Sequence, residues 1–292
     1  MPTIADLPIG AKLKFGAYSV NGEIPHKICW VKAHNDGTLL SEFIEDQCAF
    51  DAKEPDNPDE DSRCYGYNRY SLSNVHQFLN AEDNGWFHPT HEYDRAPEAH
   101  LTYRERYGYN NKPGFLHYFE SWEIDAIEDA EVKTALPKRD IPQGGEKYDI
   151  VYAKVFMPSL NNVNIGSING VSEGDVWDLF VSDGVARIGR FSPELFENPK
   201  GDRPETEQEG WYYHLRSTRA GTAWSGCIIY DGDDGASYPY DDIVGVRPAL
   251  KLSSKAQISE EPDGDGYYEV ISMPQEVIEI NEEEFFAILK KM

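Results

Sequence analysis

The sequence has few basic residues for its length. Its 292 residues include 27 lysines and arginines against 52 aspartates and glutamates, which gives a formal net charge of −25. Such a surface repels the phosphates of nucleic acids and of anionic lipids. We therefore expect neither a nucleic acid nor a membrane surface among the partners of this chain.

The sequence also lacks an export signal and long apolar runs. It opens with Met-Pro-Thr-Ile-Ala-Asp, without the basic start and apolar stretch of a secretory signal. Its most apolar windows are interrupted by charges within a few residues, far short of a membrane span. We expect a cytoplasmic product or, for a component of a virus particle, one made in the cytoplasm and carried in the virion.

Cysteines are scarce and widely spaced. The four of them, Cys29, Cys48, Cys64 and Cys227, form no Cys-x-x-Cys pair and no Cys/His cluster. This spacing excludes a structural zinc site of the usual kind. The low density suits a reducing compartment, although a single disulfide stays open.

Hydrophobic patterning predicts an α+β fold built from short antiparallel strands, two main helices and long loops. Residues 12–44 alternate apolar and polar positions around the turn formers Asn21-Gly22 and Asn35-Asp36-Gly37, which indicates a strand meander. Residues 148–157 have strand composition as well. Helices are expected at residues 71–80 and 122–134, where apolar residues recur at helical spacing behind a serine N-cap.

No internal repeat or low-complexity linker divides the chain, so we expect one domain over residues 1–252 and an extension over residues 253–292. Residues 51–63, rich in acids and prolines, are expected to form a surface loop inserted in the domain. The extension reads as a strand followed by a short helix that starts at Asn281 and carries Phe285 and Leu289. We expect the parent domain to cover those two side chains, with a partner chain as the alternative.

Aromatic residues gather between Trp211 and Tyr240 among Ser, Gly, Asp and Thr. Adaptable recognition surfaces use this mixture, because Tyr and Trp give a large contact area and the small polar residues supply hydrogen bonds. Core strands joined by Gly/Asp turns are the alternative, and we expect Trp211 and Trp224 in the core and the tyrosines exposed. The candidate ligand-binding residues are Ser217, Arg219, Trp224, Tyr230, Asp231, Asp233, Asp234, Tyr238 and Tyr240.

Catalytic and metal-binding motifs are weak or missing. The Trp224-Ser225-Gly226 segment lacks the first glycine of a hydrolase elbow, and His88, His91 and His100 do not have the His-Glu-x-x-His spacing. Residues 231–235 and 263–266 resemble calcium loops but lack the terminal glutamate, and Asp-Gly pairs are also common hairpin turns. We expect no catalytic residues and no cofactor, with calcium as the one open alternative.

Several segments together resemble an uncharacterised domain family of Gram-positive bacteria and their phages. The segments are Leu13-Lys14-Phe15-Gly16-Ala17-Tyr18, Ile28-Cys29-Trp30, Phe78-Leu79-Asn80, Trp211-Tyr212-Tyr213-His214-Leu215-Arg216-Ser217 and Gly245-Val246-Arg247-Pro248-Ala249-Leu250. They follow the expected order from about residue 12 to residue 252. That family in turn resembles the C-type-lectin superfold of lectins, formylglycine-generating enzymes and phage tropism determinants.

The resemblance implies a C-type-lectin-like fold in which the loops before the closing strand form the ligand face. It also implies that residues 245–250 form a buried strand, with Arg216 and Arg247 as structural anchors. Formylglycine-generating enzymes use two active-site cysteines, whereas only Cys227 lies in the corresponding region here. This departure argues against oxidase activity.

Three functions follow as expectations. The first is a non-enzymatic virion or surface-displayed protein that binds a glycan or protein receptor through residues 217–242. The second is a divergent metal-dependent enzyme of the same superfold, with a site around His88, His91 and Cys227. The third is a structural protein that assembles with other virion subunits or with copies of itself.

Overall fold

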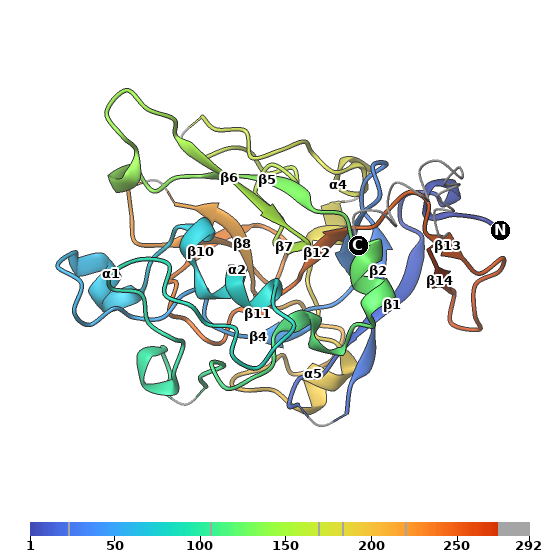
Figure 1. Cartoon of the computed structure of the whole chain (residues 1–292), viewed down its shortest axis with the longest axis horizontal. Helices are drawn as coiled ribbons and strands as arrows, with labels where there is room; N and C mark the ends of the chain where they lie inside the picture. Colours follow the sequence, from blue (N-terminus) through green and yellow to red (C-terminus); the bar gives the residue numbers. More distant parts are fainter. Residues whose placement is uncertain (23, 106, 169, 183, 220, 274–292) are drawn as a thin grey trace, which may run out of the picture.

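The computed structural model describes residues 1–273 except 23, 106, 169, 183 and 220. It has a mixed α+β architecture in which two sheets and a hairpin carry most of the regular structure and the helices are short (Figure 1). Within the described ranges, no helix has both the length and the apolar character needed to cross a bilayer. The predicted helix from Asn281 onward lies outside the described residues.

The larger sheet is a curled, partly barrel-like layer of seven strands in the order β13-β14-β1-β2-β3-β12-β7. Only the β1–β14 pair is parallel. Its strands are β1 (Lys12–Tyr18), β2 (His26–Lys32), β3 (Thr38–Ser41), β7 (Val155–Phe156), β12 (Ala249–Lys251), β13 (Gln257–Ile258) and β14 (Tyr267–Ser272). The predicted meander of residues 12–44 is confirmed as β1 to β3, and β14 joins the start of the predicted extension to the main sheet.

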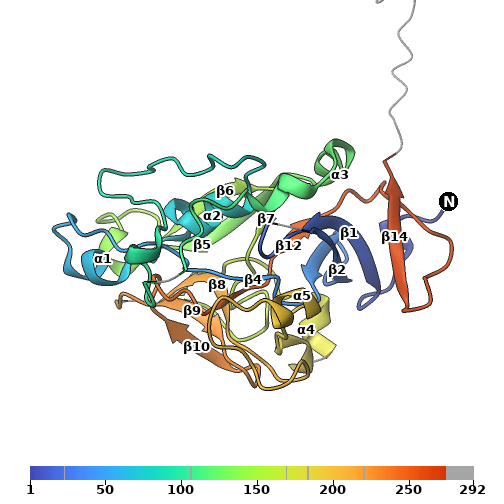
Figure 2. The same ribbon diagram turned by 90° about the horizontal axis from the view of Figure 1, so that it is seen from below.

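The second sheet has five strands in the order β10-β9-β8-β11-β4. These are β4 (Asp46–Gln47), β8 (Tyr213–Thr218), β9 (Ser225–Ile228), β10 (Asp234–Ser237) and β11 (Gly245–Val246). All six residues of β8 are buried. In Figure 2 this sheet lies to one side of the helices α2 and α3, with β10 at its outer edge.

Residues 245–250 are buried, as the sequence predicts, but they form two strands rather than one. Gly245 and Val246 belong to the five-stranded sheet, whereas Ala249 and Leu250 belong to the seven-stranded sheet. Between them Arg247 donates to the carbonyls of Ser41 and Ala186, both at 2.9 Å. Arg247 therefore anchors the point where the chain passes between the sheets.

The helices are held by local caps, because each is too short to be stable from its own hydrogen bonds. They are α1 (Glu60–Tyr65), α2 (Asn74–Leu79), α3 (Ser121–Ala126), α4 (Asp178–Ser182) and α5 (Pro193–Glu197), with 3₁₀ turns at η1 (Ile4–Asp6), η2 (Tyr70–Leu72), η3 (Ala99–Leu101), η4 (Phe115–Tyr118), η5 (Lys138–Asp140) and η6 (Gly184–Arg187). The helix predicted at residues 71–80 is confirmed as η2 and α2. Ser73 caps α2 by accepting from His76 N at 3.3 Å.

The prediction of one helix over residues 122–134 is correct only for residues up to Ala126 and is wrong for the rest. Helix α3 ends at Ala126, and the chain continues into β5 (Ala130–Ala135), which pairs antiparallel with β6 (Tyr148–Ala153). Val132 and Thr134 are β-branched and are buried at alternate positions, which is the period of a strand. Their spacing from Ile124 and Ile127 had matched the helical period by coincidence.

Residues 55–59 form an irregular and mostly exposed loop, as the composition of residues 51–63 predicts. The ends of the segment are tied to the domain, because the side chains of Asp51 and Glu54 are buried and α1 begins at Glu60. Asp51 accepts hydrogen bonds from the backbone N–H groups of Tyr67 and Asn74 at 2.8 and 3.0 Å. Burial, together with the charges of Asp94 and Glu54, raises the pKa of Asp51 well above its usual range.

His214, the second residue of β8, is expected to make folding sensitive to mild acid. The side chain is fully buried, its Nε2 lies 3.1 Å from the carbonyl of Cys48, and its Nδ1 has no partner. Burial lowers its pKa from 6.5 to about 4. Between pH 6.5 and pH 4 the imidazole is protonated in the unfolded chain but stays neutral in the folded chain. The contribution of His214 to the free energy of unfolding is therefore complete above pH 6.5 and decreases as the pH drops toward 4.

We expect His214 to account for a loss of about 3 kcal/mol in the free energy of unfolding between pH 7 and pH 4. Urea titrations of the wild type and of His214→Phe at several pH values measure this loss. The substituted chain should show a smaller decrease over the same interval. An identical pH dependence in both chains would show that other groups control the acid response.

Candidate ligand-binding surface

Five aromatic side chains from three separate segments form a cluster on the surface, here called the aromatic cluster. Tyr65 ends α1 and Tyr103 follows η3. The third segment is the β9–β10 hairpin, with Trp224 just before β9 and Tyr238 and Tyr240 just after β10. Trp224 and Tyr103 are the most open members, at 41% and 50% exposure, and the other three are half-buried. Helix α1 lies at the end of the molecule opposite the N-terminus (Figures 1 and 2).

Each ring of the aromatic cluster contacts at least one other ring of the cluster. Tyr65 and Tyr238 are stacked, with ring centroids 4.2 Å apart and an interplanar angle of 18°. Trp224 packs edge-on against Tyr238 at 5.5 Å, and Tyr103 packs edge-on against Tyr240 at the same distance. Offset stacked and edge-to-face pairs are the favoured arrangements of aromatic rings, so the cluster is a preformed surface.

Backbone hydrogen bonds hold the three segments together. Tyr240 N donates to the carbonyl of Tyr65, and Tyr103 N donates to that of Tyr240, both at 2.9 Å. The hydroxyl of Thr102 donates to the buried carboxylate of Asp242 at 2.8 Å. The positions of the rings are therefore fixed by the backbone beneath them.

The loop that carries Trp224 is anchored by Asn68. The Asn68 side-chain amide donates to Thr218 Oγ1 at 2.8 Å and to the carbonyls of Thr222 and Trp224, both at 3.0 Å. Gly221 has a φ of 71°, the left-handed conformation that glycine adopts without steric cost. The tight turn that results presents the indole of Trp224 to solvent.

Cations border the aromatic cluster in an otherwise acidic protein. The ammonium of Lys53 lies 4.9 Å from the ring centroid of Tyr240, and the guanidinium of Arg104 lies 5.4 Å from that of Tyr103. Arg219 pairs with Asp234 at 2.6 Å. Burial raises the pKa of Tyr240 to about 12, so its phenol keeps its proton and can both donate and accept hydrogen bonds at neutral pH.

The structure separates the predicted ligand-binding residues into two groups. Strands β9 and β10 pair antiparallel, with Ser225 opposite Ser237 and Ile228 opposite Asp234. Trp224, Tyr238 and Tyr240 therefore lie at one end of this hairpin, and the turn with Tyr230, Asp231 and Asp233 lies at the other. Arg219 and Asp234 meet through their ion pair.

Two of the predictions for single residues are wrong. Ser217 is fully buried, and its hydroxyl bonds to the carboxylate of Glu173 and accepts from Leu160 N at 3.0 Å. It therefore has no access to a ligand at the surface. Trp224 is exposed rather than part of the core, whereas Trp211 packs against the core and donates to the carbonyl of Ile243 at 2.9 Å.

The turn after β9 has the geometry of a hairpin. Tyr230 is 54% exposed and contacts only Tyr212 among the described rings, with centroids 6.0 Å apart. The carboxylate of Asp231 accepts from Asp233 N at 3.2 Å, and Gly232 N donates to the carbonyl of Ile229 at 3.0 Å. These local bonds explain the Asp-Gly sequence at residues 231–235 without a cation.

Of the groups considered for catalysis, His91 and His100 lie beside carboxylates and Cys227 is buried. His91 Nε2 lies 2.6 Å from the buried carboxylate of Glu54, and His100 lies 3.4 Å from that of Glu98. Burial raises the pKa of Cys227 to about 12, which keeps its thiol protonated. In the described part of the chain, no three His, Cys, Asp or Glu side chains form a group that could hold a metal ion.

Comparison with known proteins identifies a family for this chain but no individual relative. No curated protein and no solved structure matches the sequence significantly. A family model described as a domain of unknown function, DUF6273, matches residues 35–254, which include α1, η3, β9 and β10 with the whole aromatic cluster. Since this match covers most of the sequence, the chain belongs to the DUF6273 family.

Proposed function

We propose that this chain is a non-enzymatic ligand-binding protein that recognises a cell-surface glycan or protein receptor through the aromatic cluster. The observation that carries the proposal is the contact of five partly exposed rings from three segments held by backbone hydrogen bonds. Receptor-binding surfaces are rich in Tyr and Trp because these side chains lose little entropy on binding.

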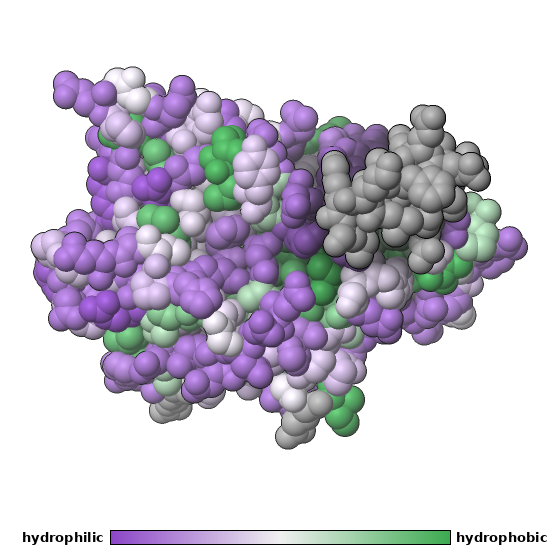
Figure 3. Space-filling view, viewed as in Figure 1, coloured by the Kyte–Doolittle hydropathy of each residue, from purple (hydrophilic) through white to green (hydrophobic). Residues whose placement is uncertain are grey.

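The polarity of one face and the net charge support the choice of ligand class. Figure 3 shows a face dominated by hydrophilic residues, with hydrophobic residues in small separate groups. The net charge of −25 disfavours phosphate-bearing partners. A neutral glycan or a protein surface fits better, because rings stack on sugar faces or fill apolar pockets and Asp234 and Arg219 offer polar contacts at the edge.

The proposal includes a C-type-lectin-like fold and a place on a phage virion or a similar surface. In that superfold the loops before the closing strand carry the ligand, and here the loops at 219–224 and 238–242 precede β11 and β12. The buried thiol of Cys227 favours binding over an oxidase of the same superfold, because a reactive cysteine needs an accessible thiolate.

The test is a binding screen of the purified chain on a glycan array and on intact Gram-positive cells. We expect binding to at least one of these surfaces, and Trp224→Ala should weaken it by at least about tenfold, the effect of removing a central aromatic contact. Tyr230→Ala is the matched control, because it removes an exposed ring of the same hairpin at the opposite end. It should leave binding unchanged.

Two outcomes would contradict the proposal. An absence of binding to both surfaces would remove the proposed function. Loss of binding in Tyr230→Ala but not in Trp224→Ala would move the site to the hairpin turn.

A further inference from the structure

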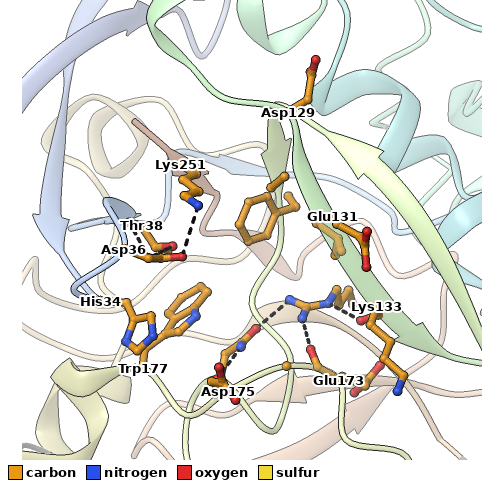
Figure 4. Close-up of a pocket in the computed structure, with 16 residues that line it drawn as sticks. His34, Asp36, Thr38, Asp129, Glu131, Lys133, Glu173, Asp175, Trp177 and Lys251 are labelled. Carbon is orange, nitrogen blue, oxygen red and sulfur yellow. Dashed lines mark hydrogen bonds and ion pairs between the residues drawn. The ribbon is translucent and has the colours of Figure 1, made fainter. Parts of the chain in front are cut away.

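A cavity of about 440 Å³ lies away from the aromatic cluster and shares no residue with it. It opens between the β5–β6 hairpin, the loop before α4 and the ends of β3 and β12. Figure 4 shows His34 and Trp177 on one side, Lys133 and Glu131 of β5 on the other, and Lys251 above them. The volume is in the range of small-ligand pockets.

Trp177 has an unpaired polar atom in this cavity. The side chain is 4% exposed, and its ring is packed against Phe180 at 6.3 Å and Phe156 at 6.5 Å. Buried tryptophans normally find an acceptor for the indole N–H. The four other buried or half-buried indoles that pack on the core do so, with Trp30 bonding to Phe15 O at 2.7 Å, Trp86 to Lys112 O at 3.0 Å, Trp122 to Glu120 Oε2 at 2.7 Å and Trp211 to Ile243 O at 2.9 Å.

No described residue accepts a hydrogen bond from Trp177 Nε1. Trp177 Nε1 is not fully buried, since it is not one of the solvent-inaccessible side-chain atoms that lack a hydrogen-bond partner. The small exposed part of Trp177 therefore includes this nitrogen. Since Trp177 lines the cavity, its N–H is open to a molecule placed there. The indole N–H of Trp177 is therefore a fixed hydrogen-bond donor in the cavity, and a ligand that carries an acceptor at this position would satisfy it.

Other lining groups supply the complementary polarity. Within the described residues, the carboxylate of Asp175 has no side-chain or backbone partner, and it faces the cavity beside Trp177 (Figure 4). His34 Nδ1 lies 2.8 Å from the carboxylate of Asp178, which leaves Nε2 for another contact. Lys251 is held more loosely, 3.4 Å from Glu128 and 3.7 Å from Asp36.

The arginine on the cavity floor uses four of its five N–H donors within the protein. Arg216 donates to the carbonyls of Lys133 and Met157 and to the side chain of Asn162, at 2.7 to 3.1 Å, and also to the carbonyl of Glu173. It therefore cannot offer the two parallel N–H groups that hold a carboxylate or phosphate. The carboxylates of Asp36, Asp129, Glu131 and Asp175 around it would repel an anion.

We propose that this cavity binds a single neutral sugar unit. A sugar hydroxyl can accept from Trp177 Nε1 and donate to Asp175, so it satisfies both unpaired groups, which a simple cation or anion does not. This site stands on different residues from the aromatic cluster and does not rest on the proposed receptor binding.

Ligand-observed NMR and calorimetry with defined sugars test the assignment. The probes are D-glucose, D-galactose, D-mannose, N-acetyl-D-glucosamine and, as an anionic counterpart, D-glucuronate. We expect at least one neutral sugar to bind and glucuronate to bind more weakly than glucose. Trp177→Phe keeps an aromatic ring, although a smaller one, and removes the N–H, so it should weaken binding about tenfold, the scale of one lost hydrogen bond to a ligand.

Two further variants separate the possible explanations. Asp175→Asn changes an exposed side chain, so it should weaken binding without affecting the fold even if Trp177→Phe is destabilised. Tyr230→Ala, which lies outside both the aromatic cluster and the cavity, should bind the same sugar as the wild type does. The assignment is overturned if none of the neutral sugars binds, if both cavity variants bind normally, or if Tyr230→Ala removes the sugar binding.

Discussion

Replacing Arg216 by methionine is expected to lower the free energy of unfolding by about 4 kcal/mol. Arg216 is 3% exposed and connects β8 to β5, to the chain after β7 and to the loop that contains Glu173. Methionine fills part of the space but leaves the acceptors on these segments without donors. It also removes the positive charge beside the buried carboxylate of Glu173, which accepts from Ala135 N at 2.8 Å.

Urea unfolding followed by tryptophan fluorescence measures the loss. Arg219→Met is the matched control, because Arg219 lies on the same chain segment and its ion pair with Asp234 is partly open to solvent, with side-chain exposures of 25% and 43%. A pair of this kind contributes much less than a fully buried arginine, on the order of 1 kcal/mol. Equal losses in the two variants would show that Arg216 is not the anchor that its contacts indicate.

Asp46→Ala is expected to cost about 3 kcal/mol, because it leaves two cations without their shared anion. Asp46 is buried and lies 2.6 Å from Lys200, and it also bonds to Lys112 and to the hydroxyl of Tyr18. Burial alone would raise the pKa of Asp46, but the two lysines outweigh it and lower the pKa to about 2.

The pH dependence of this loss gives a second check. Without Asp46, burial favours the neutral form of both lysines, so the deficit should be larger at pH 6 than at pH 9. Unfolding titrations at these two values measure it. Asp263→Ala, which removes an exposed partner of Lys14, should cause a much smaller loss at both values. A deficit in Asp46→Ala that does not change with pH would contradict the electrostatic explanation.

Local patterns in the sequence were sufficient to predict those elements of the fold that are determined by residues close together in the chain. Alternation predicted β1 and β2, in which one face packs against the core, whereas β3 is buried at all four positions. Of the two serines that could cap the helix predicted at residues 71–80, Ser71 and Ser73, the structure uses Ser73. The spacing of Ile124, Ile127 and Val132 failed, because three apolar residues fit a short helix followed by a strand as well as they fit one long helix.

The candidate site could be predicted only in part, because it is assembled from distant segments. Trp224, Tyr238 and Tyr240 lie within the predicted region, but Tyr65 and Tyr103 reach them through backbone bonds that no sequence pattern reveals. The buried position of Ser217 follows from the strand β8, in which every residue is covered. The unpaired N–H of Trp177 likewise depends on tertiary packing.

The most direct test of the central claim is the affinity for the ligand identified by the screen, measured by calorimetry for the wild type and for the double substitution Trp224→Ala/Tyr238→Ala. These two rings contact each other at 5.5 Å within the aromatic cluster. The proposal predicts a loss of affinity of about 100-fold or more, with unchanged affinity in Tyr230→Ala. An affinity in the double variant equal to that of the wild type would contradict it.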